Sequence, residues 1–181
     1  MEERLNMYIA LFRGINVGGN NILPMKELVT IFQTIGYKNV QTYIQSGNVI
    51  FGSSKQVGRK EIVGIGEEIS RKMGFEPKVL LLCEEQFQDA IKNNPFPTGN
   101  GRALHFFFLE TQPSQPNIGY LESLKTESEE FILCKKVLYV YAPEGIGRSK
   151  LAAAVEKVLG VPATARNWNT IDKLAIMAKR A

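Results

Sequence analysis

Glycine, asparagine and one arginine gather directly after the first apolar run of the chain. The stretch FRGINVGGNN, residues 12–21, follows the run MYIALF, residues 7–12. Glycines adopt backbone conformations that other residues avoid, and successive backbone N–H groups in front of a helix can bind an anion. The stretch could equally be only a tight turn, with asparagine side chains bonded to nearby backbone. An anion site here would use Arg13, Asn16, Gly18 and Gly19.

The glycine spacing excludes the two common nucleotide-binding loops. A dinucleotide-binding fingerprint needs Gly-x-Gly-x-x-Gly before a helix and an acidic residue about 20 positions later. This chain has Gly14, Gly18 and Gly19, and no matching acidic residue follows. The phosphate loop with the pattern GxxxxGK[ST] is absent as well. Any anion site in this stretch would therefore be of another kind.

Two polar stretches with basic residues lie near the end of the chain. PEGIGRSK, residues 143–150, and RNWNT, residues 166–170, each precede an expected helix. Ser149 can cap the first of these helices, and Asn167 or Asn169 can cap the second. Basic residues at a helix N-terminus oppose the helix dipole unless they meet an anion or a carboxylate. The sequence therefore predicts a second candidate anion surface, formed by Arg148, Ser149, Lys150, Arg166, Asn167, Trp168 and Asn169.

The groups that most often perform chemistry have no recognisable pattern here. His105, the only histidine, lies in the apolar run LHFFFL without a carboxylate or serine partner at a known spacing, so we interpret it as a strand residue. Cys83 and Cys134 lack metal-ligand spacing and are interpreted as buried thiols, which suits a reducing cytoplasm. Trp168 is more typical of a core or interdomain anchor than of ligand stacking. We expect no metal and no cofactor.

Composition bounds the class of protein. The 181 residues are 44% hydrophobic and 22% charged, which is typical of a globular chain. The net charge of +4 and the pI near 9.0 mildly favour anionic partners. No apolar run reaches the ~18 residues of a membrane span, and the start MEERLNMYIALFRG does not resemble a cleavable signal. We therefore expect a soluble cytoplasmic protein without a membrane partner.

Apolar periodicity predicts the same order of elements twice. Strand, helix, strand, strand, helix, strand is the order of the split βαβ or ferredoxin-like unit, and the chain offers it once in residues 7–83 and again in residues 103–166. A helix around 84–93 and a loop NPFPTGNG connect the two, and a last helix covers 170–179. The predicted fold class is α+β, with duplicated ferredoxin-like halves and antiparallel-type sheets. The predicted domains are 1–94 and 95–181.

Topology predicts which polar stretches meet. In a split βαβ unit the first two strands run parallel, so the loop after the first strand and the hairpin QSGN, residues 45–48, lie at one edge of the sheet. Gly47 and Asn48 in this hairpin also have a plain explanation, because both tolerate a positive φ. The side chains expected at this edge are Arg13, Asn16, Ser46 and Asn48. If the two halves pack inverted, this edge and the second anion surface would form one basic cleft.

Four separated motifs together resemble one known family. RGINVGG, TYIQSGNVIF, GIGRSKL and ATARNWNT occur in this order along the chain and resemble the bacterial family called domain of unknown function 1697. The resemblance spans essentially the whole chain. It implies a cytoplasmic bacterial protein with an α+β, ferredoxin-like fold, and it implies no assigned activity.

The leading functional hypothesis is a binding module for an anionic ligand, which could be a nucleotide, a nucleic acid or another phosphate compound. Arginine would pair with phosphate or carboxylate oxygens, and loop N–H groups would donate to them. One alternative is an enzyme that acts on a small anionic substrate. Another is a protein-interaction domain that uses a sheet edge and Trp168. The sequence does not determine the oligomeric state.

Overall fold

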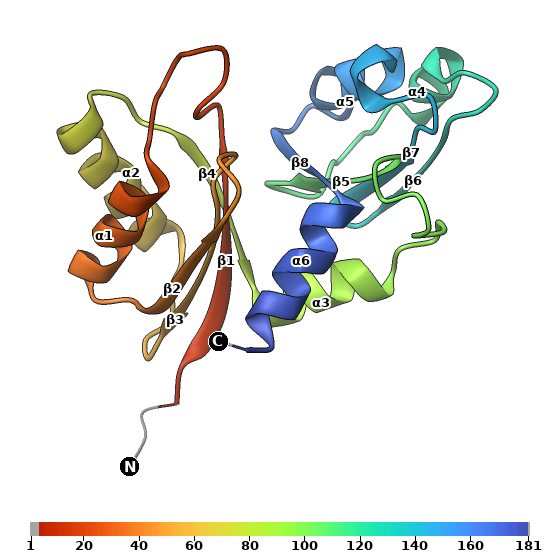
Figure 1. Cartoon of the computed structure of the whole chain (residues 1–181). Coiled ribbons are helices and arrows are strands. Elements are labelled where there is room, and N and C mark those ends of the chain that lie inside the picture. The colour runs from red at the N-terminus through yellow and green to blue at the C-terminus, as the bar shows by residue number, and fades with distance from the viewer. Residues whose placement is uncertain (1–3, 181) are drawn as a thin grey trace. The chain divides into compact units, whose positions relative to one another are not determined.

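The computed structural model describes residues 4–180, which form two compact units (Figure 1). Unit 1 consists of residues 4–89 together with 174–180, and unit 2 is Ala90–Lys173. Each unit contains one four-stranded antiparallel sheet.

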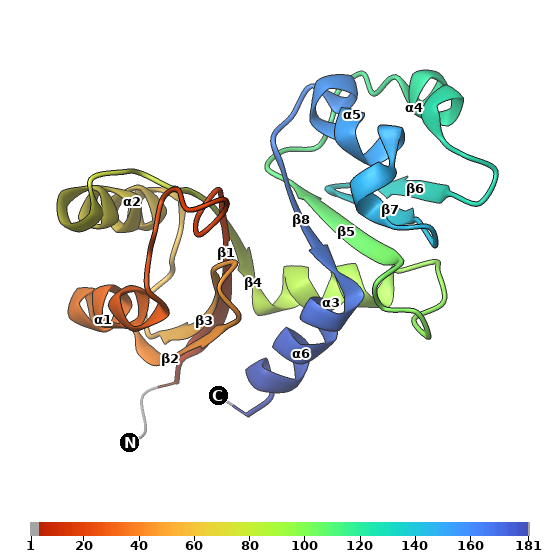
Figure 2. The same cartoon turned by 45° about the horizontal axis from the view of Figure 1, so that its top comes forward.

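Unit 1 follows the predicted order of elements. Its strands are paired in the order β2-β3-β1-β4, and every neighbouring pair is antiparallel. Helices α1 and α2 lie on the same side of this sheet (Figures 1 and 2). The elements are β1 (Asn6–Arg13), α1 (Met25–Ile35), β2 (Lys38–Tyr43), β3 (Asn48–Ser53), α2 (Arg59–Met73), β4 (Lys78–Cys83) and the start of α3 (Glu84–Lys92).

Strand alternation and helix stripes build the core of unit 1. Tyr8, Ala10 and Phe12 point from β1 to the helix side, where α1 contributes Leu28, Ile31 and Phe32. In α2, Ile65 and Ile69 are fully buried, and Ile62 and Met73 pack beside them. Ile9 and Leu11 are buried on the other face of β1. This central strand is therefore apolar over the run MYIALF, residues 7–12.

Unit 2 repeats the topology of unit 1. Its strands pair in the order β6-β7-β5-β8, again antiparallel throughout. The elements are β5 (Leu104–Leu109), α4 (Ile118–Leu124), β6 (Glu130–Cys134), β7 (Val137–Tyr141), the 3-10 turn η1 (Ile146–Arg148), α5 (Lys150–Leu159), β8 (Ala163–Asn167) and α6 (Trp168–Ala178). The prediction of an α+β fold with duplicated ferredoxin-like halves is confirmed.

The two faces of the unit 2 sheet bury different kinds of side chain. Helices α4 and α5 lie on one side of this sheet (Figure 2). On that side Phe107 and Leu109 of β5 pack with Leu121, Leu151 and Val155 in a mostly aliphatic core. Phe106 points to the other face and packs against Tyr139 and Trp168, with ring centroids 4.8 and 5.8 Å away. The hydroxyl of Tyr139 donates to the backbone oxygen of Ala90 at 2.7 Å. An aromatic layer and an aliphatic layer thus hold the same strand.

Candidate functional site

The loop after β1 is a small hairpin of its own. Asn20 N–H donates to the Val17 oxygen (3.0 Å), and Asn16 N–H donates to the Asn21 oxygen (3.1 Å). Gly18 and Gly19, between these pairs, have φ values of 58° and 77°. Two successive positive φ values define a type I′ turn, the turn that suits a two-residue hairpin and requires glycine or asparagine. Turn geometry therefore accounts for the two glycines of FRGINVGGNN.

Asn16 ties this hairpin to the turn between β2 and β3. Its Nδ2 donates to the backbone oxygens of Leu23 and Gln45, both at 2.9 Å, and its Oδ1 accepts from Leu23 N–H at 2.8 Å. Phe12 N–H also donates to the Gly47 oxygen at 2.8 Å. The structure thus brings together the two loops that the topology was expected to place at one edge. Both the nitrogen and the oxygen of the Asn16 carboxamide are therefore hydrogen-bonded to backbone groups.

The residues of the QSGN turn also have structural roles. Asn48 is fully buried, and its Nδ2 donates to the Tyr43 oxygen (2.9 Å) and to Ser46 Oγ (3.0 Å). Gly47 has a φ of 78°, and a Cβ placed there would lie 2.6 Å from Phe12 Cβ. Arg13 is half-buried at the end of β1, opposite Lys78 of β4. Most of the residues predicted for the first anion surface are therefore needed to hold its loops.

Three exposed apolar residues are neighbours in sequence of the residues that Asn16 joins. Val17, Ile22 and Ile44 are 66%, 53% and 49% exposed. They are adjacent to Asn16, Leu23 and Gln45, so the hydrogen bonds of Asn16 bring their backbone positions to one loop edge. Ile44 also has a φ of 50°, a conformation that a β-branched residue rarely adopts. We call these three residues the apolar edge of unit 1.

In unit 2, the second candidate surface lies where β7 and β8 end beside the start of β5. This is the opposite end of the topology from the unit 1 edge, whose counterpart in unit 2 is the hydrogen bond from Leu109 N–H to the Lys136 oxygen at 2.8 Å. Tyr141 is paired with Leu104, and Asn167 is paired with His105. The segments PEGIGRSK and RNWNT therefore begin at the same edge of this sheet. Ser149 Oγ accepts from Ala152 N–H at 3.0 Å, which confirms it as the cap of α5.

Asn167, Trp168 and Asn169 all have structural roles at the start of α6. Asn167 Oδ1 accepts from Thr170 N–H at 3.0 Å, so Asn167 is the residue that caps this helix. Asn169 packs against Gly101, where any Cβ would overlap Asn169 Oδ1. The ring of Trp168 lies against Phe106. This contact fits the interpretation of Trp168 as a core anchor within unit 2.

The three basic residues of this edge lie on opposite faces of the sheet. Arg166 is paired with Phe106 and so shares the face that carries Trp168. It is half-buried, burial lowers its pKa to about 10, and its Nη1 donates to the Ala165 oxygen at 2.8 Å. Arg148 and Lys150 instead flank the start of α5, on the face of Phe107. The structure therefore separates Arg166 from the other two.

Arg148 and Lys150 are exposed, and neither forms an ion pair within residues 4–180. The first turn of α5 contains no acidic residue. Ser149 satisfies the N–H groups of Ala152 and Ala153, whereas those of Lys150 and Leu151 make no hydrogen bond to the described residues. Two positively charged residues and two backbone donors thus lie within residues 148–151, at the start of one helix. This arrangement is suited to a negatively charged group.

His105 matches its interpretation as a strand residue, whereas the prediction that the two cysteines are buried holds only in part. His105 is buried in β5, its Nδ1 lies 3.5 Å from the Ala103 oxygen, and burial lowers its pKa, so the ring is neutral at pH 7. Cys83 and Cys134 are half-buried free thiols. Residues 4–180 contain no group of three or more side chains able to hold a metal ion. None of the helices in the described chain could span a membrane.

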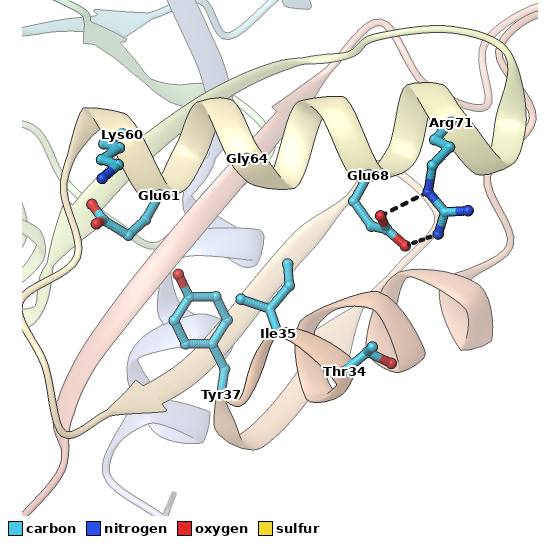
Figure 3. Close-up of a pocket in the computed structure, with 8 residues that line it drawn as sticks. All are labelled: Thr34, Ile35, Tyr37, Lys60, Glu61, Gly64, Glu68 and Arg71. Carbon is cyan, nitrogen blue, oxygen red and sulfur yellow. Dashed lines mark hydrogen bonds and ion pairs between the residues drawn. The ribbon is translucent and has the colours of Figure 1, made fainter.

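A groove between α1 and α2 of unit 1 was not predicted from the sequence (Figure 3). Its volume is about 510 Å³. The one signal for it in the sequence is Gly64, a glycine in the interior of a helix, where alanine would be more favourable. The groove is lined by Thr34, Ile35, Tyr37, Lys60, Glu61, Gly64, Glu68 and Arg71.

Comparisons with known proteins support the fold and the family. The chain is similar to a solved structure, that of the conserved bacterial protein SP0830 from Streptococcus pneumoniae, with 26% identity and a TM-score of 0.67. The similarity covers 97% of this chain and 99% of that one. The search of curated proteins gave no match. A family model described as a protein of unknown function, DUF1697, matches residues 5–139. The chain therefore belongs to the DUF1697 family.

Proposed function

We propose that this protein binds a small anionic ligand, carrying a phosphate group, at the start of α5 in unit 2. The observation that carries the proposal is the pair of exposed basic residues, Arg148 and Lys150, beside the N–H groups of Lys150 and Leu151. Lysine in the first turn of a helix is unfavourable when no anion is present. A bound anion would offset this unfavourable interaction, because it would attract both the lysine side chain and the helix N-terminus.

The chemistry of the site favours binding over catalysis. A guanidinium and an ammonium group pair strongly with phosphate oxygens, and a helix N-terminus orients its N–H groups toward the same charge. These groups hold an anion but do not accept or donate protons near pH 7. Ser149 is buried and already accepts a hydrogen bond from Ala152, as expected of a cap. The proposed role is therefore that of a binding module.

Titration with pyrophosphate tests the proposal. The binding is followed by NMR through the backbone amide signals of Lys150 and Leu151. We expect saturable shifts at these two amides in the unmodified chain and their loss in Arg148→Ala/Lys150→Ala. Lys157→Ala is the matched control, because Lys157 is exposed in the last turn of the same helix. Equal binding by the double variant and the control would disprove the site.

Salt dependence distinguishes a compact ligand from nucleic acid. Binding of a nucleic acid should weaken steeply with salt, by a slope that grows with the number of phosphates contacted, whereas one or two phosphate groups give a shallow slope. The site has two basic side chains, so we expect the shallow slope. Tighter binding to a single-stranded oligonucleotide than to pyrophosphate, with a steep slope, would support the nucleic-acid alternative instead.

The apolar edge of unit 1 supports a second candidate function, that of a protein-interaction domain. Val17, Ile22 and Ile44 expose apolar surface at one place, and clustered exposed apolar residues are typical of interaction sites. Self-association or partner binding that is lost in Val17→Ser/Ile22→Ser, with pyrophosphate binding retained, would favour this function. If the variant lost both this association and pyrophosphate binding, the cause would be a folding defect and not the loss of the apolar edge.

A further inference from the structure

Strand β6 forms an open edge of the unit 2 sheet. In the pairing order β6-β7-β5-β8, one side of β6 is paired with β7, and no strand of residues 4–180 lies on its other side. Every second residue of such a strand points its backbone N–H and C=O groups away from the sheet, where another strand can bind them. Proteins usually protect an open edge with a bulge, a proline or a covering segment.

The equivalent edge of unit 1 is protected by a bulge, whereas β6 is regular. The strand that occupies this place in unit 1 is β2, and its register shifts between Lys38 and Gln41, where Asn39 has a φ of 51°. A bulge of this kind bends and twists the edge away from further pairing. The register of β6 runs without a shift from Glu130 to Cys134, and the strand contains no proline. Unit 2 therefore keeps an edge that can accept a strand.

The middle residue of β6 is an exposed isoleucine. Among the large apolar side chains in the strands of residues 4–180, Ile132 alone is exposed, by 46%. Its neighbours Phe131 and Leu133 pack against the core beside α4 and α5, so strand alternation directs Ile132 to the opposite face of the sheet. A strand beside β6 would cover Ile132, because directly opposite residues in paired strands lie about 5 Å apart.

Charge is distributed unevenly along β6. Acidic residues precede its apolar centre, and two lysines follow it in the turn to β7. Glu127, Glu130, Lys135 and Lys136 are exposed, and none of them forms an ion pair within the described part of the chain. The strand therefore has an acidic end, an apolar centre and a basic end.

The neighbouring opposite charges leave this polarity in place. Residues 127–130 contain three glutamates, and the basic residue beside them, Lys125, is already paired with Glu122 at 2.8 Å. At the other end, Lys136 Nζ donates to the backbone oxygen of Glu110 at 3.4 Å, so one carboxylate lies near two lysines. The first end stays negative and the second stays positive.

We propose that β6 pairs with β6 of a second copy of this chain, antiparallel, about a two-fold axis at Ile132. Two four-stranded sheets then form one continuous sheet, and Ile132 lies opposite the partner's Ile132. The acidic end of each strand lies beside the basic end of the other. Glu130 lies diagonally across from the partner's Lys136, a separation that long side chains can bridge. Charge complementarity selects this partner and this direction, because parallel pairing would place like charges together.

Sedimentation velocity of the full chain over a range of concentrations tests whether this dimer forms. Pairing of two strands of five residues gives an interface at the small end of the known range, so we expect a reversible dimer with a Kd of about 10–100 µM. The dimer should weaken as salt rises, because the charges at both ends of the strand are exposed. A chain that stays monomeric at about 1 mM would overturn the proposal.

Charge reversal tests the antiparallel direction. Lys135→Glu/Lys136→Glu makes the basic end acidic, and Glu127→Lys/Glu130→Lys reverses the other end. All four side chains are exposed, so both variants should fold, and each alone should be monomeric because like charges meet across the pair. An equal mixture of the two variants should restore a dimer that contains one copy of each, which native mass spectrometry detects. Two folded variants that do not associate when mixed, or that each still dimerise alone, would overturn the arrangement.

A further set of variants places the interface on β6. Ile132→Lys puts two like charges at the two-fold axis and should abolish the dimer, whereas Ile118→Lys, at a residue of α4 that is 38% exposed, is the matched control that should keep it. Val17→Ser/Ile22→Ser, at the apolar edge of unit 1, should also leave the dimer intact. A dimer that survives Ile132→Lys but is lost in Val17→Ser/Ile22→Ser would place the interface in unit 1 and overturn the proposal. The anion site proposed at the start of α5 is independent of this dimer.

Discussion

The candidate loop edges of the two units lie at opposite ends of the same topology, and they carry different chemistry. The unit 1 edge lies where β1 ends, and the unit 2 edge lies where β5 begins. In unit 1 the polar side chains bond to the backbone, as Asn16 does with Leu23 and Gln45, and apolar side chains face the solvent. In unit 2 the caps Ser149 and Asn167 satisfy their helices, and Arg148 and Lys150 stay exposed beside them. The two units thus share a topology but carry their candidate edges at different ends of the sheet, and single side chains determine what each edge can bind.

The largest effect expected from this comparison concerns a glycine at each edge. Gly47→Ala should destabilise the protein by about 3 kcal/mol or more, because its φ is 78° and the new Cβ would lie 2.5 Å from Ile15 Cδ1. Gly145→Ala, at a φ of 103° but with no atom near the Cβ, should cost less, about 1–3 kcal/mol, from backbone strain alone. Urea denaturation of both variants measures the difference. Equal losses would mean that steric contact at the unit 1 edge is relieved by small shifts.

Removal of the Asn16 side chain should have the next largest effect. Asn16→Ala leaves the Leu23 and Gln45 backbone groups without their partner, and we expect a loss of about 2 kcal/mol. Asn20→Ala, in the same hairpin, should cost less than about 0.5 kcal/mol because the Asn20 side chain is exposed. Urea midpoints of the two variants give the comparison. A cost for Asn20→Ala as high as for Asn16→Ala would contradict the role assigned to the Asn16 carboxamide.

Ile44 allows a smaller and more specific test of the unit 1 edge. Ile44→Gly and Ile44→Ala both remove the exposed apolar side chain, but only glycine adopts the observed φ of 50° without strain. The glycine variant should therefore be about 1 kcal/mol more stable than the alanine variant, as read from thermal unfolding. An alanine variant of equal stability would indicate that the turn relaxes to another conformation once isoleucine is gone.

The smallest effect on stability is expected at Lys150 in unit 2. The same substitution should also change anion binding. Lys150→Glu places a negative charge at the start of α5 and should stabilise the protein by about 0.3–1 kcal/mol at low salt. The same change should abolish pyrophosphate binding. Thermal unfolding at low and high salt provides the check, since the gain should fall as salt rises. A variant that is more stable and still binds would place the anion elsewhere.

The sequence predicted the elements well because each had a local cause. Gly36 and Gly74 end α1 and α2 in the left-handed conformation that favours glycine, and Ser149 caps α5 as predicted. The sequence left two candidates for the cap of α6. Because α6 begins at Trp168, Asn167 is the cap, and Asn169 lies inside the first turn against Gly101.

The candidate sites were less predictable, because they depend on which face a side chain occupies. Arg166 and Lys150 belong to neighbouring motifs, but strand alternation sends Arg166 to the aromatic face of the unit 2 sheet, away from α5. The groove beside Tyr37 depends on how α1 and α2 pack, which no short motif records. The left-handed φ of Ile44 contradicts residue preference and could not be expected from sequence.

The division of the chain has a consequence for the order in which it becomes a folded protein. Residues 174–180 belong to unit 1, and Leu174 within them is fully buried. During synthesis on the ribosome, these residues emerge only after the whole of unit 2, Ala90–Lys173, has been made. Domains usually fold as units during translation, from the N-terminus onward. Here the unit that begins first is completed last, so a chain stopped at residue 173 carries every residue of unit 2 but only part of unit 1.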